Sequence, residues 1–144
     1  MINFHISMLP PSVNHIYGRG RGGRTFKNAE AEAFTDVAFY ELLANRPMET
    51  YTTFCKVDLT FTFKNKASFR RSDTDNLLKL VFDALQDAKY VKNDNLIIEV
   101  SARRVLGTAD SVSGILQSYD QDLSPSAESI DRPKVRRKQG VLQP

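Results

Sequence analysis

Apolar and polar residues alternate at the start of the chain, which predicts a β-strand over residues 2–8. The apolar members of this alternation are Ile2, Phe4, Ile6 and Met8. A period of two is typical of a strand with one buried face. The same pattern returns over residues 55–64, where the apolar members are Cys55, Val57, Leu59, Phe61 and Phe63. Residues 96–105 give a third predicted strand.

Two stretches with helical spacing separate these strands. The first follows Asn28, a residue suited to capping a helix, and has Glu30 and Glu32 in its first turn, where the helix dipole favours acids. Its apolar residues recur at Ala33, Val37, Tyr40 and Ala44. The second begins near Asp75 and fades by about Lys89. Its apolar stripe is Leu77, Leu78, Val81, Phe82 and Leu85.

The rest of the chain has weaker patterns. Residues 12–27 follow Pro10 and Pro11 and contain the stretch GRGRGGR, which predicts a loop or an open hairpin. After Gly107 the composition turns to Ser, Asp, Gln and Pro with poor periodicity. We therefore expect a domain over residues 1–106 and a flexible tail over 107–144, which carries a basic segment at 132–138. A short strand at 114–117 remains open.

The order of elements is strand, loop, helix, strand, helix, strand. This order predicts an α/β (α+β) fold: a single compact domain in which two helices pack on one mixed β-sheet. A length of 144 residues suits one domain with its own core.

The composition says more about where the protein is located than about what it does. The single cysteine, Cys55, has no internal disulfide partner, and no apolar run is long enough to span a bilayer. The first residues also lack the character of a secretory signal. We therefore expect a cytoplasmic protein with no membrane partner. The net charge of +3 is a weak indication of nucleic-acid binding.

The basic residues are clustered, and the clusters carry more information than the total. One cluster lies in the glycine-rich stretch and consists of Arg19, Arg21 and Arg24. Another precedes the second helix and includes Lys66, Arg70 and Arg71. Glycines permit mobility and arginines favour phosphates, so we expect both clusters to contact the phosphates of a nucleic acid.

Acidic residues follow the second basic cluster. Asp73 and Asp75 are two residues apart, and Lys79 lies one helical turn beyond Asp75. Asp94 opens the third strand, and would return beside the pair if that strand neighbours the one ending near Lys64. Carboxylates grouped in this way prefer Mg²⁺ or Mn²⁺, and such a site suits phosphodiester hydrolysis. Capping by Asp75, or pairing of Lys79 with Asp75 or Asp83, is the alternative.

Two stretches resemble a known family. The segment DTDNLLKLVFDAL, residues 73–85, resembles the signature of the RusA family of Holliday-junction resolvases. The segment LPPSVNHIYGRGRGGRTFKNAEAEAF, residues 9–34, is similar to the opening of that family. The resemblance covers about residues 1–106.

The resemblance implies a homodimeric, Mg²⁺-dependent endonuclease, often borne by phages or prophages, which makes paired nicks across four-way DNA junctions during recombination and repair. Residue by residue, Asp73, Asp75 and Asp94 match the metal-binding catalytic carboxylates, and Lys79 matches the active-site lysine. Asn76 belongs to the motif, and we expect it to orient an aspartate by a hydrogen bond. Asn93 stands where the family more commonly has an aspartate.

Two other functions remain open at this point. One is a nuclease of the same chemistry that acts on other branched DNA, such as flaps or forks. The other is a non-catalytic DNA-binding phage protein. A homodimer fits the junction resolvase, because symmetric cutting of two strands requires two equivalent sites related by a two-fold axis.

Overall fold

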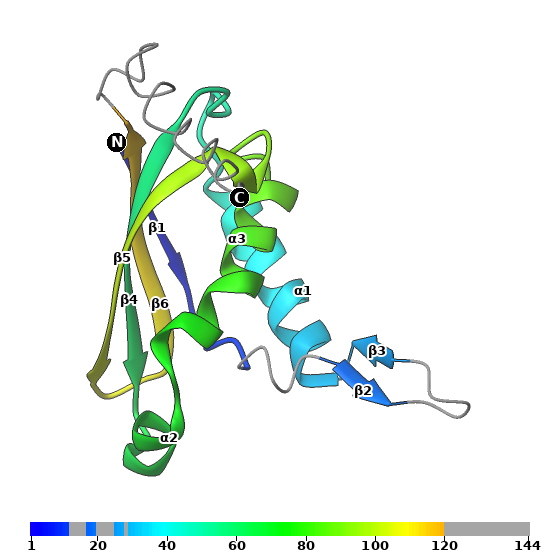
Figure 1. Ribbon diagram of the computed structural model, residues 1–144, viewed down its shortest axis with the longest axis vertical. Coiled ribbons are helices and arrows are strands. Elements are labelled where there is room, and N and C mark those ends of the chain that lie inside the picture. The colour runs from blue at the N-terminus through cyan, green and yellow to red at the C-terminus, as the bar shows by residue number, and fades with distance from the viewer. Residues whose placement is uncertain (12–16, 20–24, 28, 120–144) are drawn as a thin grey trace, which may run out of the picture.

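The computed structural model describes residues 1–11, 17–19, 25–27 and 29–119, and its centre is a four-stranded mixed sheet. In spatial order the strands are β1 (Ile2–Ile6), β6 (Ser111–Ser118), β4 (Cys55–Phe63) and β5 (Ile97–Leu106). β6 pairs antiparallel with both β1 and β4, whereas β4 and β5 are parallel (Figure 1). β1 and β5 are thus the two edges of the sheet.

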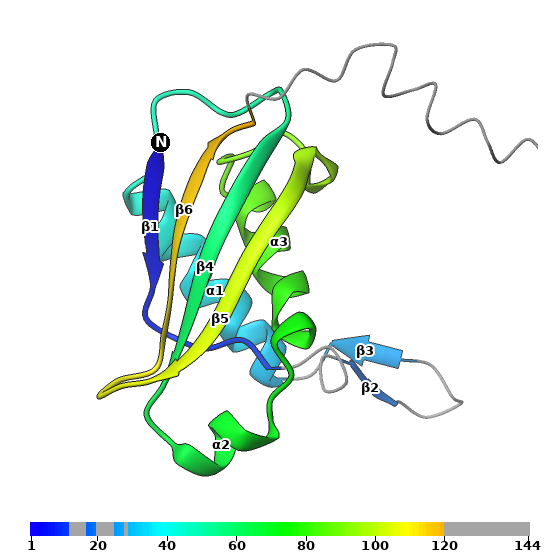
Figure 2. The same ribbon diagram turned by 60° about the vertical axis from the view of Figure 1, so that its left-hand side comes forward.

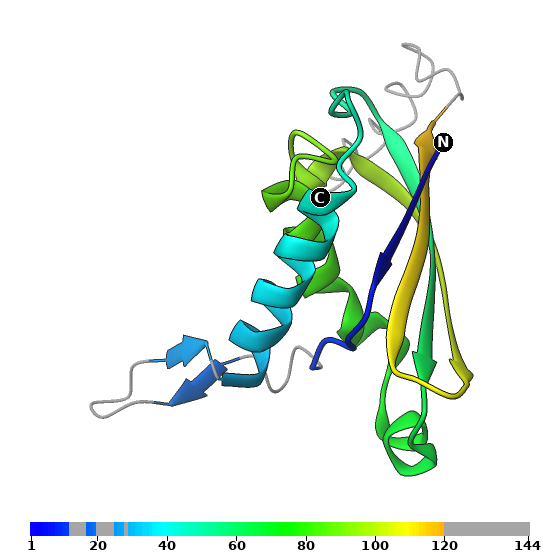
Figure 3. The same ribbon diagram turned by 180° about the vertical axis from the view of Figure 1, so that it is seen from behind.

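Two long helices cover one face of this sheet. They are α1 (Ala29–Ala44) and α3 (Leu78–Asp87), and they also contact each other (Figure 3). Within the described residues, no helix lies on the opposite face (Figure 2). This arrangement confirms the predicted α+β class with a mixed sheet and helices packed on it. The part of the chain that the structure describes contains no helix that is both long and apolar enough to cross a bilayer.

The buried faces of β4 and α1 test the sequence patterns directly. β4 is confirmed, because every second residue from Cys55 to Phe63 is buried. Helix α1 is confirmed as a helix, but the stripe that predicted it is wrong, since Tyr40 is 68% exposed. The buried residues are Ala31, Phe34, Ala38 and Leu42. Apolar residues occur on most sides of this helix, so its spacing does not single out one face.

Strand β6 extends the folded unit beyond residue 106. It lies between β1 and β4, with Val112 and Leu116 buried in the core. Gly114 pairs with Phe4, and a Cβ added at Gly114 would lie 2.2 Å from Cζ of the Phe4 ring. A side chain at position 114 would therefore overlap the Phe4 ring in its present position. The basic segment 132–138 lies outside the described residues.

Shorter elements connect the core. The strands β2 (Tyr17–Arg19) and β3 (Thr25–Lys27) pair antiparallel, as the open-hairpin prediction requires. Helix α2 (Lys66–Arg71) was not expected. It begins at Asn65, whose side chain accepts a hydrogen bond from the Ser68 amide at 2.9 Å. Two 3₁₀ turns, η3 (Thr74–Leu77) and η4 (Asp94–Leu96), lie on either side of α3 in the chain.

Candidate functional site

Asp73 and Asp75 lie on one turn at the beginning of α3. Asp73 has an extended backbone and occupies the N-cap position of η3, while Asp75 is inside that turn. Both residues are exposed, and the Asp73 side chain caps no backbone amide of the turn. The chain is thus extended at Asp73 but not at Asp75, and the turn presents two carboxylates to solvent.

Asn76 is bonded to the first of these aspartates. Its Nδ2 donates to Oδ2 of Asp73 at 3.4 Å, and its backbone amide donates to the Asp73 carbonyl at 3.1 Å. The hydrogen bond expected of Asn76 is therefore present. The backbone hydrogen bond keeps Asp73 and Asn76 close together. The side-chain hydrogen bond then limits the directions in which the Asp73 carboxylate can point.

Lys79 lies one turn further along, on α3. Its Nζ is 3.6 Å from Oδ2 of Asp83, with 51% and 37% of the two side chains exposed. Of the two pairings considered for this lysine, the structure contains the one with Asp83. Exposed pairs at this spacing contribute only about 0.3–0.5 kcal/mol. The ammonium is therefore free to turn toward a phosphate near η3 at little cost.

Asp94 does not join this group. Its amide donates to Oε1 of Gln86 at 2.8 Å, which places it beside the end of α3, whereas η3 precedes the beginning of α3. A helix of ten residues is about 15 Å long. In keeping with this separation, the described residues contain no group of three His, Cys, Asp or Glu side chains that could hold a metal ion.

The direction of β5 explains why the predicted convergence within one chain is wrong. The third strand does neighbour the second, as the prediction required, but the two are parallel. Cys55 pairs with Ile97 at one end and Phe63 with Leu106 at the other. Asp94 therefore returns beside the beginning of β4, while the chain leaves the end of β4 toward Asp73. Figure 2 shows the two ends far apart along the sheet.

Arg104 is a site residue that the sequence pattern did not single out. Its Nε donates to Oγ1 of Thr74 at 3.1 Å, its Nη1 donates to the Phe69 carbonyl, and its guanidinium lies 4.8 Å from the Phe69 ring centroid. Arg104 is opposite Phe61 on the helix-covered face of the sheet. Arg104 could have been found from the sequence, because it is a charged residue at a position where the strand pattern expects an apolar one.

Basic side chains surround the aspartate turn. Lys66, Arg70 and Arg71 are exposed on α2, which ends just before Asp73. A hollow of about 350 Å³ lies beside them. It is lined by Met8, Leu9, Pro10, Pro11, Glu30, Phe63, Asn65, Ser68, Arg71, Ser72, Leu77 and Asp110. The two segments that resemble the RusA family thus meet in space at this hollow. Arg21 and Arg24 lie outside the described residues, and Arg19 is described only by its backbone in β2.

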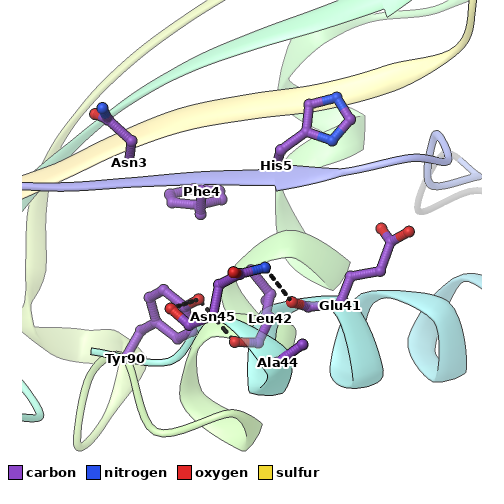
Figure 4. A pocket seen from close by; sticks show the side chains of 8 residues that line it. All are labelled: Asn3, Phe4, His5, Glu41, Leu42, Ala44, Asn45 and Tyr90. Carbon is purple, nitrogen blue, oxygen red and sulfur yellow. Dashed lines mark hydrogen bonds between the residues drawn. The ribbon is translucent and has the colours of Figure 1, made fainter. Parts of the chain in front are cut away.

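A second hollow lies beside β1, an edge strand of the sheet. It has a volume of about 470 Å³ and lies between β1 and the end of α1 (Figure 4). The hydroxyl of Tyr90 donates to the Leu42 carbonyl at 2.8 Å in its wall, and burial raises the pKa of this phenol. None of the candidate residues lines this hollow, so it lies apart from the aspartate turn.

Comparison with known proteins supports the resemblance of both segments. The family model described as endodeoxyribonuclease RusA matches residues 8–113. A crossover junction endodeoxyribonuclease RusA from Aquifex aeolicus (strain VF5) is 33% identical over 99 residues, which cover 69% of this chain and 76% of that protein. The family match includes the aspartate turn, Asp94 and Arg104, and reaches into β6.

Proposed function

Because the chain belongs to the RusA family of endodeoxyribonucleases, we propose that it resolves four-way DNA junctions by paired nicks, as a homodimer that uses a divalent cation. The observation that carries this proposal is the exposed turn with Asp73 and Asp75, preceded by the basic helix α2 and followed by Lys79. Acidic ligands for a cation and basic contacts for a polyanion lie next to each other there.

The chemistry of the turn fits Mg²⁺ or Mn²⁺. Both cations prefer carboxylate oxygens, and Asp73 and Asp75 supply these without competing ion pairs among the described residues. Such a cation, when bound, polarises a phosphate oxygen and acidifies a water molecule. Asn76 holds the carboxylate of Asp73, and Lys79 offers positive charge where the phosphate becomes more negative in the transition state.

The third carboxylate comes from the second protomer in this proposal. Asp94 and the aspartate turn lie at opposite ends of α3. When two copies related by a two-fold axis place their α3 helices antiparallel, Asp94 of each copy approaches the aspartate turn of the other. The dimer then has two equivalent sites, each built from both chains, and two equivalent sites are what symmetric cutting of a junction requires.

The basic residues hold the substrate in this arrangement. Lys66, Arg70 and Arg71 are exposed beside the aspartate turn and contact phosphates on the strand to be cut. We also expect Arg19, Arg21 and Arg24 to contact phosphates. Phosphate contacts position the DNA without reading its sequence.

The direct test is Mg²⁺-dependent cleavage of a synthetic four-way junction, with the nick positions mapped on all four strands. We expect two nicks at symmetric positions on opposite strands, and no nicking in EDTA. A panel of flaps and forks identifies a nuclease with another branched substrate. The proposal of a nuclease is overturned if no branched DNA is cut in either Mg²⁺ or Mn²⁺.

A further inference from the structure

Helix α1 carries apolar side chains on the side that faces away from the sheet as well as on its buried side. The buried side packs against β1 and α3, and the other side turns outward (Figure 3). There Tyr40 is 68% and Leu43 is 40% exposed. Ala33 and Ala44 are exposed at helical spacing from Tyr40. Helices that are apolar on all sides are typically covered on all sides, so we expect a partner on the outer side of α1.

Acidic side chains border this apolar stripe. Glu30, Glu32 and Asp36 are exposed, and α1 contains no lysine or arginine. Glu32 and Asp36 are four residues apart, a spacing at which like charges destabilise a helix. Neither belongs to an ion pair within the described residues. A cationic partner would relieve this repulsion. The surface that consists of Glu32, Ala33, Asp36, Tyr40 and Leu43 is called the α1 outer face below.

The charge of the α1 outer face is unsuited to DNA. The four acidic residues of α1 give this helix a charge of −4, although the whole chain has a net charge of +3. The rest of the chain therefore carries +7. Carboxylates repel phosphates, so DNA is expected to bind elsewhere on the molecule. The α1 outer face instead favours a basic partner that also has apolar groups.

The basic segment 132–138 of the same chain has this chemistry. Its sequence is RPKVRRK, and no acidic residue follows it. An arginine over the exposed ring of Tyr40 makes a cation–π contact, and its guanidinium also pairs with a neighbouring carboxylate. The segment lies outside the described residues and outside residues 8–113, which match the RusA family.

The chain that leads to this segment starts close to α1 and is long enough to reach it. The amide of Tyr119, just after β6, donates to the carbonyl of Phe54 at 3.0 Å. Phe54 belongs to the connection between the end of α1 and the beginning of β4. The 13 residues from there to Arg132 span up to about 45 Å. α1 has 16 residues and is about 24 Å long, so the whole α1 outer face is within reach.

We propose that the basic segment 132–138 binds the α1 outer face of its own chain in the protein without DNA. Its basic side chains pair with Glu32 and Asp36, and one of them lies over Tyr40. A tethered segment has an effective concentration on the order of millimolar at its binding surface, so a few exposed ion pairs are enough to hold it. This interaction is separate from the proposed nuclease function.

A disulfide tests which residues meet. In the full-length chain, we expect Ala33→Cys combined with Val135→Cys to form a disulfide within one chain on mild oxidation. The matched control combines Val135→Cys with Thr53→Cys, because Thr53 is exposed and adjoins Phe54. A segment that binds nowhere would react with position 53 at least as often as with position 33, since its chain starts beside position 53. The native Cys55 is buried and is not expected to interfere.

A neutral α1 tests the charges independently. Glu32→Gln combined with Asp36→Asn removes two negative charges with little change in side-chain size. We expect trypsin to cut within 132–138 roughly three- to tenfold faster in this variant, because two exposed ion pairs are lost and cleavage follows the unbound population. The control, Asp87→Asn with Glu99→Gln, neutralises two exposed acids on α3 and β5 and should leave the rate unchanged. Circular dichroism checks that the helices are retained.

Three results would overturn the inference. One is a disulfide that forms no more readily at position 33 than at position 53. Another is a disulfide that joins two chains instead of two positions of one chain. The third is a trypsin rate in the neutral α1 variant that equals the rate in its control. None of these measurements uses DNA cleavage, so the inference and the proposed function fail independently of each other.

Discussion

Arg104 of β5 donates a hydrogen bond to Thr74, the residue between Asp73 and Asp75, with Nε 3.1 Å from Oγ1. The same guanidinium donates to the carbonyl of Phe69 and lies over its ring. One side chain from the sheet therefore joins the basic helix α2 to the aspartate turn. We therefore expect Arg104 to position both carboxylates through Thr74.

Replacement of Arg104 should weaken the binding of the divalent cation more than the binding of DNA. We expect Arg104→Gln to raise the Mg²⁺ concentration for half-maximal cleavage by about 10–100-fold, the usual effect of losing a group that orients metal ligands. Junction affinity measured without metal should change only modestly. Arg46→Ala is the control, because it removes an equal charge from the turn after α1. Equal effects of both variants would contradict a positioning role.

Asp75→Asn should abolish cleavage and leave binding intact. The change removes an acidic ligand while making the surface less negative, so attraction to DNA is not weakened. Cleavage in Mg²⁺ and junction binding in EDTA are the two measurements. Asp87→Asn, an exposed acid at the end of α3, is the matched control. Wild-type cutting by the Asp75 variant would remove it from the metal site.

Mixing two inactive variants should restore activity if each site draws on two chains. A dimer of one Asp75→Asn chain and one Asp94→Asn chain has one site with both changes and one site with neither. We expect the mixture, after subunit exchange, to nick one strand of a junction while each variant alone is inactive. A mixture as inactive as its components would place all three carboxylates of a site on one chain.

Neutralising α2 should reduce the salt dependence of binding. Removing one basic side chain that binds a phosphate lowers the slope of log affinity against log salt concentration by about one. We expect a reduced slope for the triple change of Lys66, Arg70 and Arg71 to alanine, and likewise for Arg19, Arg21 and Arg24. Lys89→Ala, exposed beyond α3, provides a baseline for a single basic residue. A slope that stays at the wild-type value would exclude phosphate binding by the cluster in question.

The stability of the fold should decrease in alkaline solution. Burial raises the pKa of Cys55 above its ordinary value of 9.0, and that of Tyr90 above 10.0. Both groups are neutral when buried and ionise more readily once unfolded, so their stabilising contribution is complete below about pH 9 and is lost as pH rises toward the folded values. Urea unfolding at pH 7–11 measures this loss. We expect Tyr90→Phe to have a shallower decline, with Tyr40→Phe as the exposed control.

Individual helices and strands were predicted from the sequence more accurately than the pairing of the strands in the sheet. The alternation in β4 is regular because one whole face of this central strand is buried. β6 was harder to predict because its inward positions include Gly114, whose missing side chain leaves room for Phe4. When a glycine replaces one apolar residue of the alternation, the pattern in the sequence looks like that of a loop. Only the neighbouring strand shows why the glycine is there.

Of the geometry expected around the candidate site residues, the local contact within the turn was predicted and the distance to Asp94 was not. Asn76 bonds Asp73 as expected, because three residues of local spacing determine that contact. The distance from Asp94 to the aspartate turn depends on whether β5 runs parallel or antiparallel to β4, and periodicity is the same in both cases. Arg104 breaks the apolar pattern of its strand, but only the fold shows that it reaches Thr74.

The length of α3 has a consequence for control of cutting. If a lone protomer lacks the third carboxylate of each site, nuclease activity exists only where two protomers have met. At concentrations below the dissociation constant of the dimer, the rate then rises with the square of the protein concentration. Under that condition, a low protein concentration limits cutting, and a branched substrate that brings two protomers together also assembles the sites that cleave it.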